Sequence, residues 1–203
     1  MMIHMTNSHI IPYMVWNESN LDLEWHYGPQ PAQQKYAHDM LRAEALGLQT
    51  GNLPLALAQV KDTKSKQEEA LAYRSRFGAM IVHEIRVFLP VNEERALYNL
   101  LLDFGYGLPD AQVLNYWQEK APVKTTNDAQ VKWLLVKRNN ELLLVLCTWN
   151  PEPESVEVKL DPVILGMTPA AASNEETKEA IPFADGKLTL KLDGYGVRMI
   201  RLK

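Results

Sequence analysis

The residues of this sequence that are best suited to chemistry are gathered in segment 21–28, which reads Leu-Asp-Leu-Glu-Trp-His-Tyr-Gly. Two carboxylates, one imidazole and two aromatic rings stand close together in it, at Asp22, Glu24, Trp25, His26 and Tyr27. Such groups are costly to bury without partners. A polar, ring-shaped ligand needs aromatic surfaces for stacking and oxygen atoms that accept hydrogen bonds. The segment therefore indicates one wall of a pocket for such a ligand.

The two carboxylates of this segment admit two interpretations. In an extended chain, positions two apart point the same way, with Cβ atoms about 6–7 Å apart, so Asp22 and Glu24 could form an acid and base pair. Alternatively, they lie in a solvated loop or pair with neighbours such as Arg42. We favour the second interpretation for catalysis and keep ligand contact open for both residues. No catalytic residue is assigned.

Three histidines, His4, His26 and His83, do not follow the spacing of a compact metal motif, so we expect hydrogen-bonded structural histidines, no metal site and no cofactor. His83 and Glu84 close an apolar run over 78–84 that predicts a buried strand. At the end of a strand, these two side chains would join the ligand-binding residues. Trp16 could stack on a ligand, but an aromatic residue near a strand is predicted to pack in the core.

Composition limits the classes of partner. The chain has 203 residues, 46% of them hydrophobic, and a net charge of −4. We expect no nucleic-acid partner and no membrane partner, because no cluster of basic residues and no run long enough to cross a bilayer stands out. Residues 1–7 have none of the regions of a signal peptide, and the cellular location stays open. The single cysteine, Cys147, lies in an apolar run and is predicted to be a buried hydrophobic residue.

The first half of the chain alternates between predicted strands and predicted helices. Strands are expected at 2–5, 53–58 and 78–84, and helices at 33–46, 65–77 and 93–104. Apolar strands that alternate with helices are typical of parallel β/α units. In such units, side chains at the carboxyl ends of the strands face the ligand.

The second half changes character after residue 120. Alternating or short apolar runs predict five strands, at 131–136, 142–149, 156–160, 188–192 and 197–202. Asn139-Asn140 and Asp185-Gly186 suit tight hairpin turns. Five short antiparallel strands with one apolar face predict a small β-sandwich. We therefore expect an α/β domain over 1–120 and an all-β domain over 121–203.

The α/β domain holds about three β/α units, whereas a closed barrel needs eight. It is therefore expected to be the last units of a (β/α)8-type barrel, whose missing strands come from a longer chain or a partner chain. The first half of the chain contains the motifs His4-Met5-Thr6-Asn7, Leu23-Glu24-Trp25 with Tyr27-Gly28, Arg42-Ala43-Glu44 and Val82-His83-Glu84. Together they resemble the last third of the catalytic barrel of family 123-like glycoside hydrolases, bacterial proteins related to β-N-acetylgalactosaminidase. The tail from Val131 is similar to the β-sandwich that follows such barrels.

The resemblance implies a carbohydrate ligand and a hydrolase fragment that acts on glycosidic bonds, N-acetylhexosaminides being one candidate class. In that family, catalysis is attributed to an adjacent Asp-Glu pair on an earlier strand, with the substrate's acetamido group as the nucleophile. This sequence contains no Asp-Glu dipeptide, so no catalytic residue carries over and activity of this chain alone is not expected. The alternative is a non-catalytic carbohydrate-binding or scaffold protein derived from such an enzyme. A truncated reading frame without activity is a third interpretation. The full-length relatives are expected to be secreted or periplasmic.

Overall fold

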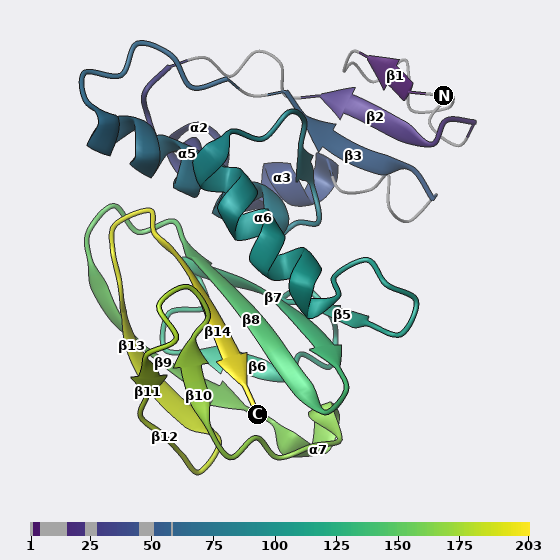
Figure 1. The fold of residues 1–203 in the computed structure, drawn as a ribbon, viewed down its shortest axis with the longest axis vertical. Coiled ribbons are helices and arrows are strands. Elements are labelled where there is room, and N and C mark those ends of the chain that lie inside the picture. The colour runs from purple at the N-terminus through teal and green to yellow at the C-terminus, as the bar shows by residue number, and fades with distance from the viewer. Residues whose placement is uncertain (1, 5–15, 23–27, 45–50, 58) are drawn as a thin grey trace. The chain divides into compact units, whose positions relative to one another are not determined.

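The computed structural model describes residues 2–4, 16–22, 28–44, 51–57 and 59–203 (Figure 1). The chain divides into two compact units, Met1–Arg95 and Ala96–Lys203. The first combines a parallel sheet with helices, and the second contains two antiparallel sheets. The mixed α/β and all-β character predicted from the sequence is confirmed.

The parallel sheet of the first unit has the strand order β1-β2-β3-β4. Its strands are β1 (Met2–His4), β2 (Ser19–Asp22), β3 (Leu53–Ala56) and β4 (Arg86–Val87). Each neighbouring pair runs parallel. Strand β2 was not expected from the sequence, because Ser19 and Asn20 are turn-forming residues; here Asn20 is buried, with 3% of its surface exposed.

The main helix of the first unit begins at a residue that caps it. Helix α5 (Lys66–Ile81) starts at Ser65, whose hydroxyl accepts a hydrogen bond from the backbone N–H of Glu68 at 3.1 Å. The helix contacts β4, α2 (Ala32–Lys35) and α3 (His38–Glu44). One helix was predicted over 33–46, and the structure has two short ones in its described part.

The predicted strand over 78–84 is wrong. Helix α5 continues through Ile81, and the true strand, β4, begins only at Arg86. Every residue from Ser75 to Ile81 is buried, so this end of the helix is enclosed on all sides and its sequence shows no amphipathic period. A continuous apolar run cannot distinguish a buried strand from a buried stretch of helix.

Helix α6 (Asn92–Phe104) is confirmed nearly to the residue. The Glu94 carboxylate accepts a hydrogen bond from the backbone N–H of Val91 at 3.1 Å, as in one half of a capping box. It also pairs with the guanidinium of Arg76 on α5. Both side chains of this ion pair are almost fully buried, with 4% of Arg76 and 0% of Glu94 exposed.

The second unit contains a six-stranded sheet, β11-β10-β14-β8-β7-β5, and a four-stranded sheet, β12-β13-β9-β6 (Figure 1). The five predicted strands are confirmed as β7 (Val131–Arg138), β8 (Glu141–Thr148), β9 (Glu154–Leu160), β13 (Lys187–Leu192) and β14 (Val197–Leu202). Five shorter strands were missed: β5 (Gln112–Asn115), β6 (Val123–Thr125), β10 (Ala172–Asn174), β11 (Ala180–Ile181) and β12 (Phe183–Ala184). A four-residue helix, α7 (Pro162–Leu165), follows β9.

The two antiparallel sheets share one hydrophobic core, to which Trp133, Leu144, Val158 and Leu188 contribute. Strands β7 and β8 are buried on both faces, whereas one apolar face was predicted. The predicted hairpin turns are confirmed, because Asn139 and Asn140 both have positive φ, and Asp185 and Gly186 do as well.

The antiparallel part begins before the predicted boundary at residue 120. Strand β5 precedes that boundary, and yet it pairs with β7 over four residues, from Gln112 with Lys137 to Asn115 with Leu134. The Tyr116–Pro122 segment, which contains the predicted boundary, is therefore a connection within the second unit.

A charged network on the six-stranded sheet, between Glu141 on β8 and Arg201 on β14, predicts that the stability of the protein depends on pH. The Glu141 carboxylate accepts a hydrogen bond from Nε of Arg201 at 2.9 Å. That bond, helped by the positive charges of Arg201 and Lys203, lowers the pKa of Glu141. Because the folded state then prefers the ionised carboxylate, its contribution to stability is complete above the unfolded pKa of about 4.3. This contribution to stability is lost as the pH falls through the lower pKa that Glu141 has in the folded state.

We therefore expect Glu141→Gln to destabilise the protein near neutral pH, with a difference in melting temperature that shrinks as the pH is lowered through the acid range. Melting curves recorded by circular dichroism across this range would measure it. Glu119→Gln, at an exposed position of the same unit, is the control and should track the wild type. A difference that grows toward acid pH would contradict the assignment.

Candidate functional site

The carboxyl ends of the parallel strands meet at one edge of the first unit's sheet. Strand β1 ends at His4, β2 at Asp22, β3 at Ala56 and β4 at Val87. The register places Asp22 beside Ala56, and Ala56 beside Val87. Asp22 therefore lies at the edge where parallel sheets bind their ligands. His4, which sequence reasoning set aside, ends the strand next to it.

The loops that leave this edge are held together by backbone hydrogen bonds. The carbonyl of Gly28, which ends the segment rich in candidate groups, accepts a bond from the N–H of Lys61 at 3.4 Å. Gly28 has a φ of 138°, a backbone conformation that residues with a side chain rarely adopt. The loop after β2 and the loop after β3 thus meet at Gly28 and Lys61.

Leu89 adds an apolar group to the same edge. It lies two residues after the end of β4, has a φ of 53° and leaves 74% of its surface exposed. A bulky residue with positive φ is uncommon and strained, and such strain is concentrated at functional sites. Sequence reasoning missed Leu89, because Phe88-Leu89 reads only as the continuation of an apolar strand.

Four of the predicted ligand-binding residues, Glu24, Trp25, His26 and Tyr27, lie outside the described residues. The described chain stops at Asp22 and resumes at Gly28. In the sequence, the four candidates stand between Asp22, the last residue of β2, and Gly28. Their contact with a ligand stays a prediction.

His83 and Glu84 do not lie at this edge, and their predicted place at the end of a strand is wrong. They form the turn between α5 and β4, which is at the amino end of β4. His83 is fully buried, and its Nδ1 donates a hydrogen bond to the carbonyl of Ala79 at 2.7 Å. Glu84 has a φ of 59° and closes the helix end, where Ile85 N–H bonds to the carbonyl of Met80. Both positions are explained by the end of the helix.

Trp16 was predicted to be a core residue, and this prediction is wrong. Its side chain is 82% exposed and precedes β2, so it lies at the amino edge of the sheet. At the same edge, the side-chain amide of Asn52 donates a hydrogen bond to the backbone carbonyl of Asn17 at 2.9 Å.

The chemistry available to the described part of the site is hydrogen bonding and apolar contact. No three His, Cys, Asp or Glu side chains are grouped as metal ligands among the residues that the structure describes. Within the same residues, no helix is both long and apolar enough to traverse a bilayer. Cys147 is buried, as predicted.

Several solved structures share the fold of this chain, and they include glycosidases. A family 27 β-L-arabinopyranosidase from Geobacillus stearothermophilus, solved in complex with arabinose, matches with a TM-score of 0.59 and 11% identity, over 97% of this chain and 48% of that chain. A maltogenic α-amylase from Thermotoga neapolitana matches with a TM-score of 0.53 and 11% identity, over 98% and 54%. α-Galactosidase I from Mortierella vinacea matches with a TM-score of 0.51 and 10% identity, over 92% and 53%. The fold is that of glycosidases, and the chain spans about half the length of these enzymes.

A family match narrows the class for the second half of the chain. Residues 93–184 match the family "Glycoside hydrolase 123, C-terminal domain". The C-terminal part of the chain is therefore like that of glycoside hydrolase family 123, as the resemblance of the tail from Val131 indicated. Among curated proteins, none matches the sequence.

Proposed function

We propose that this chain is the C-terminal portion of a glycoside hydrolase, made of the last β/α units of a barrel and the β-sandwich that follows them. The observation that carries the proposal is the order of the two units. A parallel sheet precedes two antiparallel sheets, and the second unit contains the family 123 match. The likeness to glycosidases over 97% of the chain supports the same interpretation.

The proposed substrate site is the carboxyl edge of the parallel sheet. Asp22 and the loop that includes Glu24, Trp25, His26 and Tyr27 would form one wall, with hydrogen-bond acceptors and stacking surfaces for a sugar ring. Leu89 would add apolar surface. His83 and Glu84 are left out of this proposal, because they lie at the opposite edge.

The incomplete sheet supports a further part of the proposal. Among the described strands, β1 and β4 are the two edges of the sheet, and each pairs on one side only. Parallel sheets in β/α proteins are normally closed or covered, because an open edge exposes unpaired backbone groups. The remaining barrel strands would come from a longer chain or from a partner chain, and would supply the acidic catalytic pair.

The experiment that tests the site is a titration with N-acetylgalactosamine and N-acetylglucosamine, followed by tryptophan fluorescence. We expect a saturable change for at least one sugar, and we expect Trp25→Phe to remove it, because an indole that stacks on a sugar changes its emission. Trp16→Phe is the matched control: it removes an exposed indole at the other end of β2 and should keep the change.

Two results would contradict the site. The first is an absence of any saturable change with either sugar, which would exclude binding of N-acetylhexosamines at this site. The second is an equal loss in Trp16→Phe and Trp25→Phe, which would place the ligand elsewhere on the chain.

A non-catalytic carbohydrate-binding or scaffold protein is the second candidate, and the absence of an Asp-Glu dipeptide favours it over an enzyme that is active alone. An assay on an aryl N-acetylhexosaminide separates the two candidates. Turnover that disappears in Glu24→Gln would show that the chain is itself catalytic. Binding without turnover would be compatible with both a binding protein and an incomplete enzyme. Restored turnover after addition of the missing barrel strands would then identify the incomplete enzyme.

A further inference from the structure

The outer face of the four-stranded sheet carries lysines that the strand register brings together. Lys124 on β6 lies directly opposite Lys159 on β9, and Lys159 also lies opposite Lys187 on β13. Because Val158 and Leu160 belong to the core, the side chain of Lys159 points to the outer face of the sheet. All three lysines are exposed. Neighbouring strands are about 4.8 Å apart, so the three positions form a short row of positive charge.

Only one member of this row is neutralised within the second unit. Lys187 pairs with Glu157 at 3.4 Å. Neither Lys124 nor Lys159 forms an ion pair among the residues that the structure describes. Like charges directly opposite each other destabilise a sheet. The Lys124 and Lys159 pair therefore costs stability that nothing in the described part of the chain offsets.

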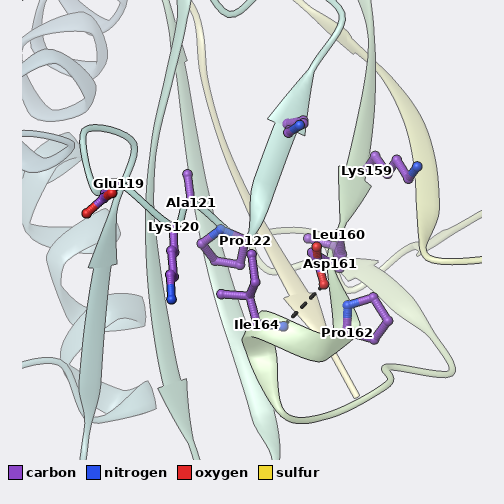
Figure 2. A pocket seen from close by; sticks show the side chains of 10 residues that line it. Glu119, Lys120, Ala121, Pro122, Lys159, Leu160, Asp161, Pro162 and Ile164 are labelled. Atoms are coloured by element: carbon purple, nitrogen blue, oxygen red, sulfur yellow. Dashed lines mark hydrogen bonds between the residues drawn. The ribbon is translucent and has the colours of Figure 1, made fainter.

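A pocket of roughly 550 Å³ opens beside these two lysines and is within the size range of small-ligand sites. Its apolar surface comes from Ala121, Pro122 and Ile164, and a third lysine, Lys120, lies at its wall. Figure 2 shows Lys120 next to Pro122 and Ile164.

The acidic groups of the pocket do not cancel the lysines. The Asp161 carboxylate accepts hydrogen bonds from the N–H group of Val163 at 2.9 Å and from that of Ile164 at 3.2 Å; Figure 2 shows the bond with Ile164. Glu119 also lines the pocket and is exposed. Three lysines thus stand against two carboxylates, which leaves the lining of the pocket with a net charge of +1 in a protein whose net charge is −4. The sequence did not reveal this cluster, because its members are separated by up to 39 positions between Lys120 and Lys159.

We infer that this pocket is a second binding site, which takes an acidic saccharide. The carboxylate or sulfate group of the sugar lies between the ammonium groups of Lys124 and Lys159, and the ring lies over Ala121 and Ile164. Aliphatic surface beside a pair of ammonium groups fits a ligand that has both a ring face and an anionic group. The choice of an anion rests on the lysines, whereas the choice of a saccharide as its carrier rests on the proposed function.

The test is a calorimetric titration of the full chain with tri-galacturonate, compared with the neutral galactose trisaccharide and with inorganic sulfate. We expect tri-galacturonate to bind more tightly than either reference, and its binding to weaken as the ionic strength rises from about 0.01 to about 0.1 M. Lys124→Gln/Lys159→Gln should weaken binding roughly tenfold, since two charge contacts are lost. The melting temperature of this variant should stay the same or rise, because a repulsive pair is removed.

The matched single variants are Lys159→Gln and Lys191→Gln. Lys191 is exposed and lies on the same outer face of β13, opposite Ser155, but it does not line the pocket. Only Lys159→Gln should weaken binding. Equal affinity for the neutral trisaccharide or for sulfate, or full binding in the double variant, would overturn the inference.

This outcome is independent of the outcome for the proposed substrate site. Trp25→Phe should leave the affinity for tri-galacturonate unchanged. If N-acetylhexosamines fail to bind while tri-galacturonate binds through the lysines, the substrate site fails and the lysine site stands. The opposite pair of results would overturn the lysine site alone.

Discussion

Glu94→Ala is expected to reduce the free energy of unfolding by about 3–5 kcal/mol, because it leaves the buried guanidinium of Arg76 without its counter-charge. Arg76 is only 4% exposed, so water cannot replace the lost carboxylate. The substitution also removes the acceptor for the N–H of Val91 at the start of α6. Urea unfolding followed by circular dichroism would measure the loss.

Two variants control for this prediction. Glu93→Ala changes the exposed neighbour of Glu94 and should shift stability by less than about 0.5 kcal/mol. Arg76→Met/Glu94→Leu removes both charges and should cost less than Glu94→Ala, since an apolar pair leaves no buried charge unpaired. A loss below about 1 kcal/mol in Glu94→Ala would show that water or another group reaches Arg76.

Gly194→Ala has the second large expected effect, a loss of at least about 2 kcal/mol. Gly194 lies in the turn between β13 and β14, and a Cβ atom at this position would be 1.9 Å from the carbonyl oxygen of Pro151. The next residue, Tyr195, donates its N–H to the carbonyl of Asn150 at 2.8 Å, so the two backbone segments cannot separate without losing this bond.

Gly166→Ala is the control for Gly194→Ala. Gly166 has a φ of 65°, but the nearest atom to its added Cβ would be Nζ of Lys137, at 3.7 Å. The control therefore measures the cost of a left-handed backbone alone, about 1 kcal/mol. A smaller loss in Gly194→Ala than in Gly166→Ala, measured by urea unfolding, would contradict the close packing of the turn.

The parts of the fold that could be predicted from the sequence are those with a clear local period. Helix α6 has apolar residues at helical spacing, and β9 and β13 alternate, as Val156, Val158 and Leu160 show. The two hairpin turns were predictable because asparagine, aspartate and glycine tolerate positive φ. The second unit was therefore predicted strand by strand wherever its strands are long.

The errors arose where tertiary burial overrides local pattern. The run over 78–84 is apolar because the end of α5 is enclosed, and no local feature separates this from a buried strand. Strands of two to four residues, such as β4 and β12, carry too few side chains to show a period. For the candidate site, Asp22 was recognised by its residue type, but its place at the end of a strand was not predicted, because β2 was not expected from the sequence. Leu89 and the lysine row could not be predicted, because they depend on backbone strain and on register.

Cys147 gives a way to observe the two units separately. It is the only cysteine of the chain, it is 0% exposed, and it lies on β8, between β14 and β7 in the six-stranded sheet. A thiol reagent can reach it only when that sheet opens, so the rate of labelling reports the opening of the second unit. Glu94→Ala acts in the first unit and Gly194→Ala in the second. The pattern of their labelling rates would therefore show whether the two units unfold as one cooperative block or independently.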